Sequence, residues 1–276
     1  MRTETTGAIV LRTQDYGESD RIVTVLSRDA GKFAGVAKGA KRSRRRFPGS
    51  LEIFAHVRLD YRHREGAELA FLERAVLVRP WRSLLCSLER YAAASHVVEV
   101  ADKLTAEREV GDELYRLVLA TLARLDAEEP GPATLRLFEL AALSACGYGP
   151  ELGTCRTCRR SLDARSEAVR ITPRAGGVVC RDCAGRGEGG VIVSAAALGA
   201  LRGLQDAVGR ALAAARRNGS SGLESVYQQE ASFVAPAQPA ASEVRSAIAV
   251  LLEPHLRSRL RVLELLGPIW RQPDSR

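Results

Sequence analysis

The sequence predicts an α+β protein in which a five-stranded β-barrel precedes a helical domain that carries an inserted four-cysteine module. Three observations support this fold class. Apolar residues alternate with period two over the first 80 residues, follow a helical period after Pro80, and are sparse around two CxxC pairs. A chain of 276 residues is long enough for two or three modules with their own cores. The expected domains cover residues 1–80, 81–149 together with 191–276, and 150–190.

The barrel is predicted from five short segments with strand character. In EIFAHVRLDY (52–61), the odd positions from Ile53 to Tyr61 are mostly apolar and the even positions are mostly polar, as in a half-buried strand. Glycines fall at or near the breaks that separate the other four segments, which cover residues 6–12, 21–27, 31–39 and 68–78. Five short strands in so few residues favour the partly open OB-fold barrel. An SH3-like barrel is the alternative.

A helical period replaces the alternation after Pro80. The clearest apolar face consists of Leu114, Leu117, Val118, Thr121, Leu122 and Leu125, spaced as on an amphipathic helix. We expect helices at about 83–105 and 133–146 on either side of it, and two more that begin at Ser194 and near Ser242. Residues 213–242 are rich in Ala, Ser, Gly and Pro, which predicts a flexible insertion.

Two CxxC pairs, CRTC and CRDC, are the most specific motif in the chain. Four thiolates on two tight turns complete the tetrahedral sulfur shell that zinc prefers. The predicted ligands of one structural zinc ion are Cys155, Cys158, Cys180 and Cys183. Four sulfurs leave no open coordination position, so this zinc is not expected to be hydrolytic. Two disulfides are an alternative that a cytosolic location disfavours, and a redox CxxC is one that the two copies without a βαβ context disfavour. The other two cysteines, Cys86 and Cys146, are expected to be core thiols.

Several functional classes find no support in the sequence. No stretch approaches the roughly 18–20 uninterrupted apolar residues of a membrane span, and the N-terminus does not resemble a secretory signal. We therefore expect a cytoplasmic protein with reduced cysteines and no membrane contact. The four histidines belong to no nucleophile or metal motif, and no phosphate-binding glycine loop follows a strand. We expect the protein not to be an enzyme.

The formal charge of +8 is concentrated near the N-terminus, because residues 1–65 hold 14 Lys/Arg and 8 Asp/Glu. Six of these cations fall within KGAKRSRRRF (38–47): Lys38, Lys41, Arg42, Arg44, Arg45 and Arg46. The segment is predicted to leave the third strand as a loop at the barrel rim, where it can follow a phosphate backbone. A solvated loop is the alternative. Aromatic residues are scarce at 5%, so we expect binding through phosphates, with little regard to base sequence or strand number.

Five segments carry a resemblance to a known family. They are GAIVLRTQDYGESDRIVTVLSRDAGKFAGVAKGAKR, GSLEIFAHVRLDY, ERYAAASHVVEVAD, CGYGPELGTCRTC and LLEPHLRSRLRVLELL. In these segments the chain resembles the RecO family of bacterial recombination mediators, in an order that spans most of its length. The insertion at 213–242 departs from the compact pattern of that family, and the zinc cysteines occur in only part of it.

The resemblance implies a nucleoid-associated protein that binds single- and double-stranded DNA, anneals complementary strands and helps to load RecA on protein-coated single strands. It also implies RecR and the C-terminal tail of single-stranded DNA-binding protein as partners, with RecA contacted indirectly. That acidic tail can dock on Arg257, Arg259 and Arg261, or these residues can cap or solvate a terminal helix. The alternative function is a zinc-ribbon RNA-binding protein of the translation or transcription machinery.

Overall fold

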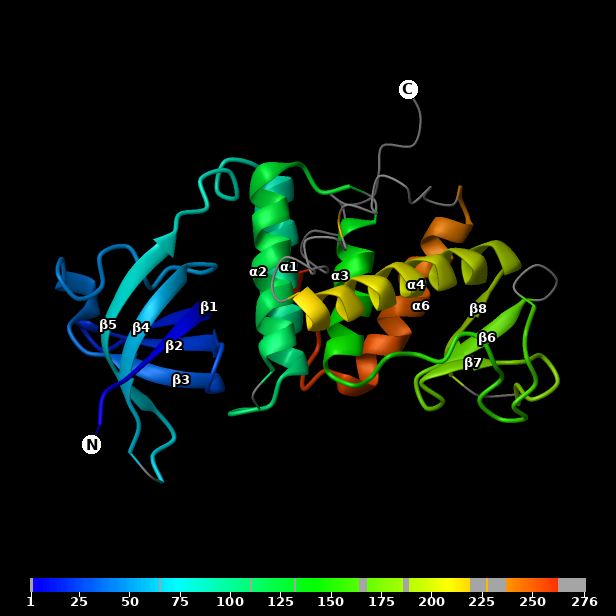
Figure 1. Cartoon of the computed structure of the whole chain (residues 1–276), viewed down its shortest axis with the longest axis horizontal. Coiled ribbons are helices and arrows are strands. Elements are labelled where there is room, and N and C mark those ends of the chain that lie inside the picture. Colours follow the sequence, from blue (N-terminus) through cyan, green and yellow to red (C-terminus); the bar gives the residue numbers. More distant parts are fainter. Residues whose placement is uncertain are drawn as a thin grey trace. The chain divides into compact units, whose positions relative to one another are not determined.

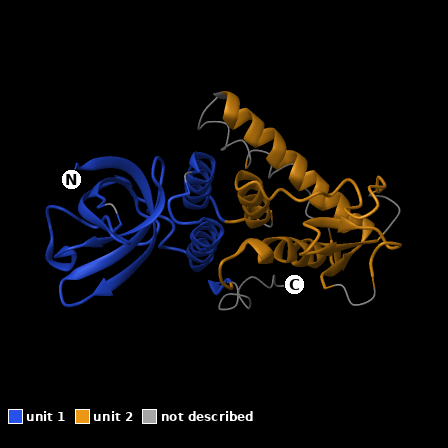
Figure 2. Ribbon diagram, turned by 90° about the horizontal axis from the view of Figure 1, so that it is seen from below, with its two compact units in different colours: residues 1–129, 260–276 blue, residues 130–259 orange. Residues whose placement is uncertain are grey.

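The computed structural model divides the chain into two compact units, shown in Figure 2. Unit 1 consists of residues 1–129 and 260–276, and unit 2 of residues 130–259. The structure describes residues 2–64, 66–109, 111–131, 133–163, 168–185, 189–218, 227 and 237–262. No helix in these ranges is both long enough and apolar enough to span a membrane.

Unit 1 contains a closed five-stranded barrel (Figure 1), which confirms the predicted OB-like architecture. Its strands are β1 (Glu4–Tyr16), β2 (Asp20–Ser27), β3 (Gly31–Ala37), β4 (His56–Arg62) and β5 (Ala70–Arg79). The order is β1-β2-β3-β5-β4, and β4 returns to pair with β1. Only β3 and β5 pair in parallel among these strands, through Gly35 with Ala70 and Val36 with Phe71.

The β3–β5 contact depends on a glycine. A Cβ atom on Gly35 would lie 2.4 Å from Cδ2 of Leu72, which is fully buried in the barrel core. A side chain there would push the two strands apart at the point where the barrel closes. Inward residues of all five strands fill the core, as the period-two alternation predicts.

Strand β4 begins four residues later than the alternation in residues 52–61 suggests. The chain turns before it, with Ala55 N–H donating to the Glu52 carbonyl at 3.1 Å. Phe54 has φ of 72°, and its buried carbonyl accepts a hydrogen bond from Trp81 Nε1 at 2.8 Å. The apolar residues at the start of this segment therefore anchor a turn and do not extend the strand.

Two helices complete the described core of unit 1: α1 (Leu88–Leu104) and α2 (Asp112–Ala127). The predicted apolar face of α2, from Leu114 to Leu125, is buried throughout. Helix α1 starts five residues later than expected because Ser87 caps it, its Oγ accepting from Arg90 N–H at 3.3 Å. Cys86 consequently precedes the helix and is exposed, so its assignment as a core thiol was wrong.

Unit 2 combines helices with a small antiparallel sheet of order β7-β6-β8 (Figure 1). Its elements are α3 (Thr134–Ala145), β6 (Val169–Thr172), β7 (Gly177–Val179), β8 (Val191–Val193), α4 (Ala195–Asn218) and α6 (Ala240–Leu252). Helix α3 packs against α4 and α6, and α6 also contacts β6 and β8. Cys146, at the C-cap of α3, is half-buried.

The predicted flexible insertion at 213–242 overlaps a helix at each end. Helix α4 continues to Asn218 and α6 begins at Ala240, so both ends of the segment are helical. Most of the remainder lies outside the described residues. The division into three domains, which are residues 1–80, 81–149 with 191–276, and 150–190, stays a prediction.

A buried ion pair links β3 to the C-terminal part of α1 within unit 1. Lys32 Nζ donates to the main-chain carbonyl of Asp102 and lies 3.2 Å from its Oδ1, and Arg12 Nε lies 2.9 Å from Oδ2. The Lys32 and Asp102 side chains are only 7% and 11% exposed. A buried ammonium group is tolerated only with such partners, so the pair fixes the helix against the barrel.

We predict that Asp102→Ala lowers the free energy of unfolding by about 3–5 kcal/mol, because it leaves the Lys32 ammonium buried without its carboxylate. The double variant Lys32→Met/Asp102→Leu should recover most of the loss. Urea denaturation followed by Trp81 fluorescence in a Trp270→Phe background measures both. The control is Glu129→Ala, which removes a carboxylate that is 61% exposed from its pair with Arg90 and should cost about 0–1 kcal/mol. Equal effects of Asp102→Ala and the control would contradict the assignment.

Candidate nucleic-acid interface and metal site

Residues 38–46, here called the cationic loop, leave β3 and pass through the short 3₁₀ helix η1 (Ala40–Arg42). The structure places all six predicted cations in this loop as exposed residues: Lys38, Lys41, Arg42, Arg44, Arg45 and Arg46. The loop lies between β3 and β4 in the sequence, as predicted.

The C-terminal end of the cationic loop is fastened to the barrel. Phe47 and Leu51, which follow the loop, are buried in the barrel core. Ser50 Oγ donates to the Ala75 carbonyl at 2.9 Å, and Ala75 N–H donates to the Arg46 carbonyl at 2.9 Å. The arginines therefore project from a backbone that is hydrogen-bonded to β5.

The N-terminal end of the loop is fastened to the β1–β2 hairpin. Gly39, with φ of 66°, donates its N–H to Asp20 Oδ1 at 2.8 Å, and this bond and the Ser19 hydroxyl lower the pKa of Asp20. Lys41 N–H donates to the Ser19 carbonyl at 3.0 Å. The left-handed backbone at Gly39 is one that other residues rarely adopt.

The six cations divide into engaged and unengaged groups. Lys41 Nζ lies 3.1 Å from Asp15 Oδ2, and its hydrogen bond lowers the pKa of that carboxyl group. Arg46 Nη2 donates to the Lys38 carbonyl at 2.6 Å, and its guanidinium lies 5.3 Å from the centre of the Phe47 ring. Lys38 contributes electrostatically to the lowered pKa of Asp20.

The second group consists of Arg42, Arg44 and Arg45. Their side chains form no hydrogen bond or ion pair with any residue that the structure describes. Three guanidinium groups of like charge close together in the sequence repel one another, and an anion between them relieves this repulsion. The loop thus presents three cations that are free to contact phosphate oxygens.

One aromatic ring is exposed next to the cationic loop. Phe33, Phe47, Phe54 and Tyr61 are buried, as expected for rings that serve the core. Tyr16 is 57% exposed and ends β1, immediately before Gly17, whose carbonyl accepts a hydrogen bond from Lys41 Nζ at 3.1 Å. The sequence did not separate Tyr16 from the core aromatics, although its place before a turn glycine was a usable signal.

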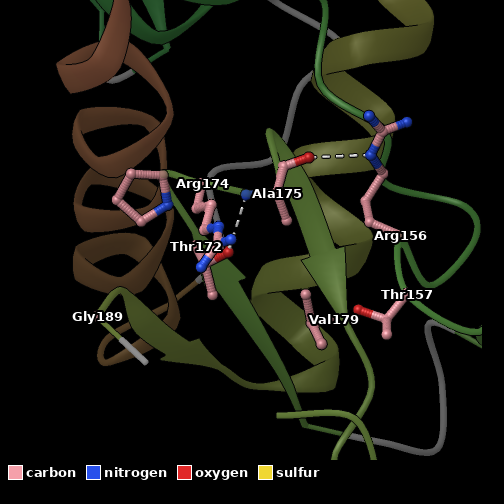
Figure 3. Close-up of a pocket in the computed structure, with 8 residues that line it drawn as sticks. Arg156, Thr157, Thr172, Arg174, Ala175, Val179 and Gly189 are labelled. Atoms are coloured by element: carbon pink, nitrogen blue, oxygen red, sulfur yellow. Dashed lines mark hydrogen bonds between the residues drawn. The ribbon is translucent and has the colours of Figure 1, made fainter. Parts of the chain in front are cut away.

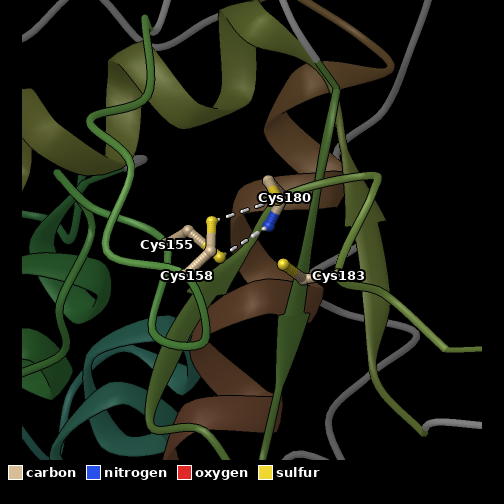
Figure 4. Close-up of side chains that lie close together, drawn as sticks. All are labelled: Cys155, Cys158, Cys180 and Cys183. Carbon is tan, nitrogen blue, oxygen red and sulfur yellow. Dashed lines mark hydrogen bonds between the residues drawn. The ribbon is translucent and has the colours of Figure 1, made fainter.

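The four cysteines of the two CxxC pairs come together in unit 2 (Figure 4). Their sulfur atoms all lie within 4.8 Å of one another. Cys155 and Cys158 lie on one turn, and Cys180 follows β7 directly on the other, with Cys183 three residues later. Backbone hydrogen bonds shape both turns, because Arg159 N–H donates to the Cys155 carbonyl at 2.9 Å and Cys183 N–H to the Cys180 carbonyl at 3.1 Å. This cluster can hold a metal ion.

Two thiols of the cluster, those of Cys155 and Cys183, have pKa values shifted in opposite directions. Burial opposes ionisation of Cys155, but backbone N–H groups, chiefly those of Cys158 and Cys180, lower its pKa to about 6. Hydrogen bonds with the thiols of Cys180 and Cys158 raise the pKa of Cys183 to about 12. The main chain of the two turns thus stabilises the Cys155 thiolate, and a bound cation would stabilise further thiolates in the cluster.

The remaining candidate residues do not form a common site. His56 contacts the Tyr115 hydroxyl at 3.1 Å, and His255 stacks on Tyr148 with ring centres 4.0 Å apart. The three C-terminal arginines, Arg257, Arg259 and Arg261, are exposed, but the first two belong to unit 2 and the third to unit 1. Docking of an acidic tail on them stays a prediction.

Comparisons with known proteins cover nearly the whole chain. Residues 1–81 match the family described as Recombination protein O N terminal. Residues 86–232 match the family described as Recombination protein O C terminal. DNA repair protein RecO of Anaeromyxobacter sp. (strain K) is 39% identical over 271 residues, which are 97% of this chain and 98% of that protein.

Two further relatives carry the same name. DNA repair protein RecO of Myxococcus xanthus (strain DK1622) is 37% identical over 80% of this chain and 88% of its own length. The protein of that name from Geobacter metallireducens is 40% identical over 72% of this chain and 79% of its own length. The matches fall on the barrel, the helices and the four-cysteine module alike. The chain therefore belongs to the RecO family of DNA repair proteins.

Proposed function

We propose that this protein is a DNA-binding recombination mediator that contacts the sugar-phosphate backbone through its cationic loop. The observation that carries the proposal is a set of three exposed arginines, Arg42, Arg44 and Arg45. They have no hydrogen bond or ion pair within the described residues and lie on a loop fastened at both ends. Membership of a family whose members are named DNA repair protein supports it. The same loop would bind single- and double-stranded DNA, because phosphates carry no base identity.

Strand annealing follows from the same charge. Two complementary strands repel each other through their phosphates, and a row of fixed cations reduces this repulsion while base pairing supplies the specificity. Because the backbone of the loop is already ordered by its anchors, binding loses little further conformational freedom. The loop would thus raise the rate at which complementary strands meet without reading their sequence.

The partners proposed for this chain are those that the family resemblance implies. We propose that it acts with RecR, contacts the C-terminal tail of single-stranded DNA-binding protein, and thereby helps to load RecA on coated single strands. An acidic tail would be attracted by the same electrostatics that attract DNA, so Arg257, Arg259 and Arg261 stay candidates for that contact.

We propose that the four-cysteine cluster holds one structural zinc ion. Sulfurs at about 2.3 Å from a tetrahedral zinc are about 3.8 Å from one another. Cys158 Sγ and Cys180 Sγ lie 3.8 Å apart, and the other sulfur pairs fall within 4.8 Å, so the residues fit the ion. Zinc would neutralise the thiolates and hold the two turns together in a module with few apolar residues.

Removing the three unengaged arginines tests the DNA contact. In the variant Arg42→Ala/Arg44→Ala/Arg45→Ala, we expect the log–log salt slope for a single-stranded oligonucleotide to become shallower by about 2, since each lost phosphate contact removes about 0.7. At roughly 0.1 M salt this corresponds to a loss of affinity of about a hundredfold. Fluorescence anisotropy over a salt series measures both quantities.

The matched control is Arg58→Ala/Arg64→Ala/Arg74→Ala, which removes the same charge from exposed positions of unit 1 outside the loop. It should change the slope little. Annealing of complementary oligonucleotides should slow in the loop variant alone. Equal slopes in both variants would exclude the loop, and a preference of the wild type for folded RNA over single-stranded DNA would favour the RNA-binding alternative.

The exposed Tyr16 ring predicts a difference between single and double strands. Tyr16→Ala should weaken binding of a single-stranded oligonucleotide by about 1–3 kcal/mol, because an unpaired base loses its stacking partner. Duplex binding should be unchanged, since its bases are already stacked. Parallel titrations measure the two affinities, with Tyr148→Ala, an exposed ring of unit 2, as the control. Equal losses for both forms of DNA would rule out stacking.

The metal proposal predicts one zinc ion per purified chain by elemental analysis. Cys180→Ser removes one sulfur and should release the zinc and expose residues 150–190 to limited proteolysis, because the two turns lose their link. Cys86→Ser is the control, since Cys86 is exposed and outside the cluster. A metal-free wild type with an equally protease-resistant module would refute the proposal.

A further inference from the structure

A hollow of about 630 Å³ opens in the four-cysteine module (Figure 3). Its walls come from the first cysteine turn, the end of β6, the β6–β7 turn, β7 and the residues before β8. The lining residues are Arg156, Thr157, Thr172, Pro173, Arg174, Ala175, Val179 and Gly189. Among the residues that the structure describes, the lining includes two arginines and two threonines and no acidic residue.

Arg156 is held in a defined orientation at one wall. Its Nε donates to the Ala175 carbonyl at 2.9 Å, a contact drawn in Figure 3. Its two terminal nitrogens form no hydrogen bond with the described part of the chain. Arg156 also helps to lower the pKa of Glu151, but that carboxylate accepts hydrogen bonds from Gly153 and Thr154 N–H and is not part of the lining. The guanidinium therefore keeps an edge with free N–H donors.

Arg174 supplies the second cation from the β6–β7 turn. It is exposed, and its side chain has no hydrogen bond or ion pair within the described ranges. The turn that carries it is fixed, because Ala175 N–H donates to Thr172 Oγ1 at 3.2 Å and Gly176 adopts φ of 62°. Arg174 is thus a second unneutralised cation on an ordered backbone.

The two walls are joined by main-chain contacts. Arg156 N–H donates to the Val178 carbonyl at 2.9 Å, and Val178 N–H donates to the Glu151 carbonyl at 3.0 Å. A Cβ on Gly177 would lie 2.3 Å from the Glu151 carbonyl oxygen, so glycine permits this close approach. Because Arg156 also lies between Cys155 and Cys158, the metal cluster and the hollow share one piece of backbone.

Phosphate is the ligand that this chemistry fits. A guanidinium offers two parallel N–H donors to two oxygens of one phosphate, and threonine hydroxyls can donate to a third. Both arginines are exposed, which suits a phosphate on a long polymer better than an enclosed small molecule. We propose that the hollow binds a backbone phosphate of nucleic acid, as a second contact in unit 2 in addition to the cationic loop of unit 1. This inference rests on the proposed DNA binding.

The test compares Arg174→Ala with Arg181→Ala in the zinc-loaded full chain. Arg181 is exposed in the same module but does not line the hollow, so the control removes the same charge. For a single-stranded oligonucleotide at roughly 0.1 M salt, Arg174→Ala should lower affinity about fivefold and make the salt slope shallower by about 0.7. Arg181→Ala should leave both near the wild-type values. Unchanged zinc content in each variant checks that the module is intact.

The possible outcomes separate this inference from the proposed function. Wild-type binding that depends on the cationic loop but not on Arg174 would overturn the inference alone, and equal losses in both variants would also overturn it. A wild type that binds no oligonucleotide would refute the proposed function. Free inorganic phosphate is the other source of the same ligand chemistry, and a calorimetric titration measures whether the protein binds it. Phosphate binding that is lost in Arg174→Ala while oligonucleotide affinity is unchanged would assign the hollow to a small anion and contradict the inference.

Discussion

The side chains of Phe47 and Leu51, which lie between β3 and β4 in the sequence, are buried in the apolar core of the barrel. This burial determines where the cationic loop lies. Burying two such side chains stabilises the fold by about 1.5–3 kcal/mol each. Two unit charges about 7 Å apart in water repel by only about 0.6 kcal/mol. The apolar anchors therefore outweigh the repulsion among exposed cations. The barrel can hold the loop in place although no described residue pairs with Arg42, Arg44 or Arg45.

In the four-cysteine module of unit 2, contacts of the fold also hold exposed arginines in place without ion pairs to described residues. Hydrogen bonds of the main chain order the turns that carry Arg156 and Arg174, so neither arginine needs a carboxylate partner to be positioned. Within the described residues neither arginine forms an ion pair, so an incoming anion need not first break one. Lys32 shows the contrasting case, since this buried cation is paired with Asp102 and serves the fold.

Much of the fold was predictable because it follows from local patterns. Alternation identified the strands, helical spacing identified the buried face of α2, and the spacing of the CxxC pairs identified the sulfur cluster. The division of the loop into engaged and unengaged cations was not predictable, because it depends on contacts such as that of Lys41 with Asp15 across the hairpin. The strands β6, β7 and β8 have only three or four residues, which is too few for a readable alternation.

The proposed function depends on direct contact of Arg42, Arg44 and Arg45 with the phosphate backbone. Chemical modification of arginine with phenylglyoxal, read by mass spectrometry in the presence and absence of a single-stranded oligonucleotide, tests it most directly. We expect all three to react readily in the unbound protein and to become protected in the complex, while Arg58, Arg64 and Arg74 react equally in both. Loop arginines that react at the same rate with and without saturating oligonucleotide would contradict it.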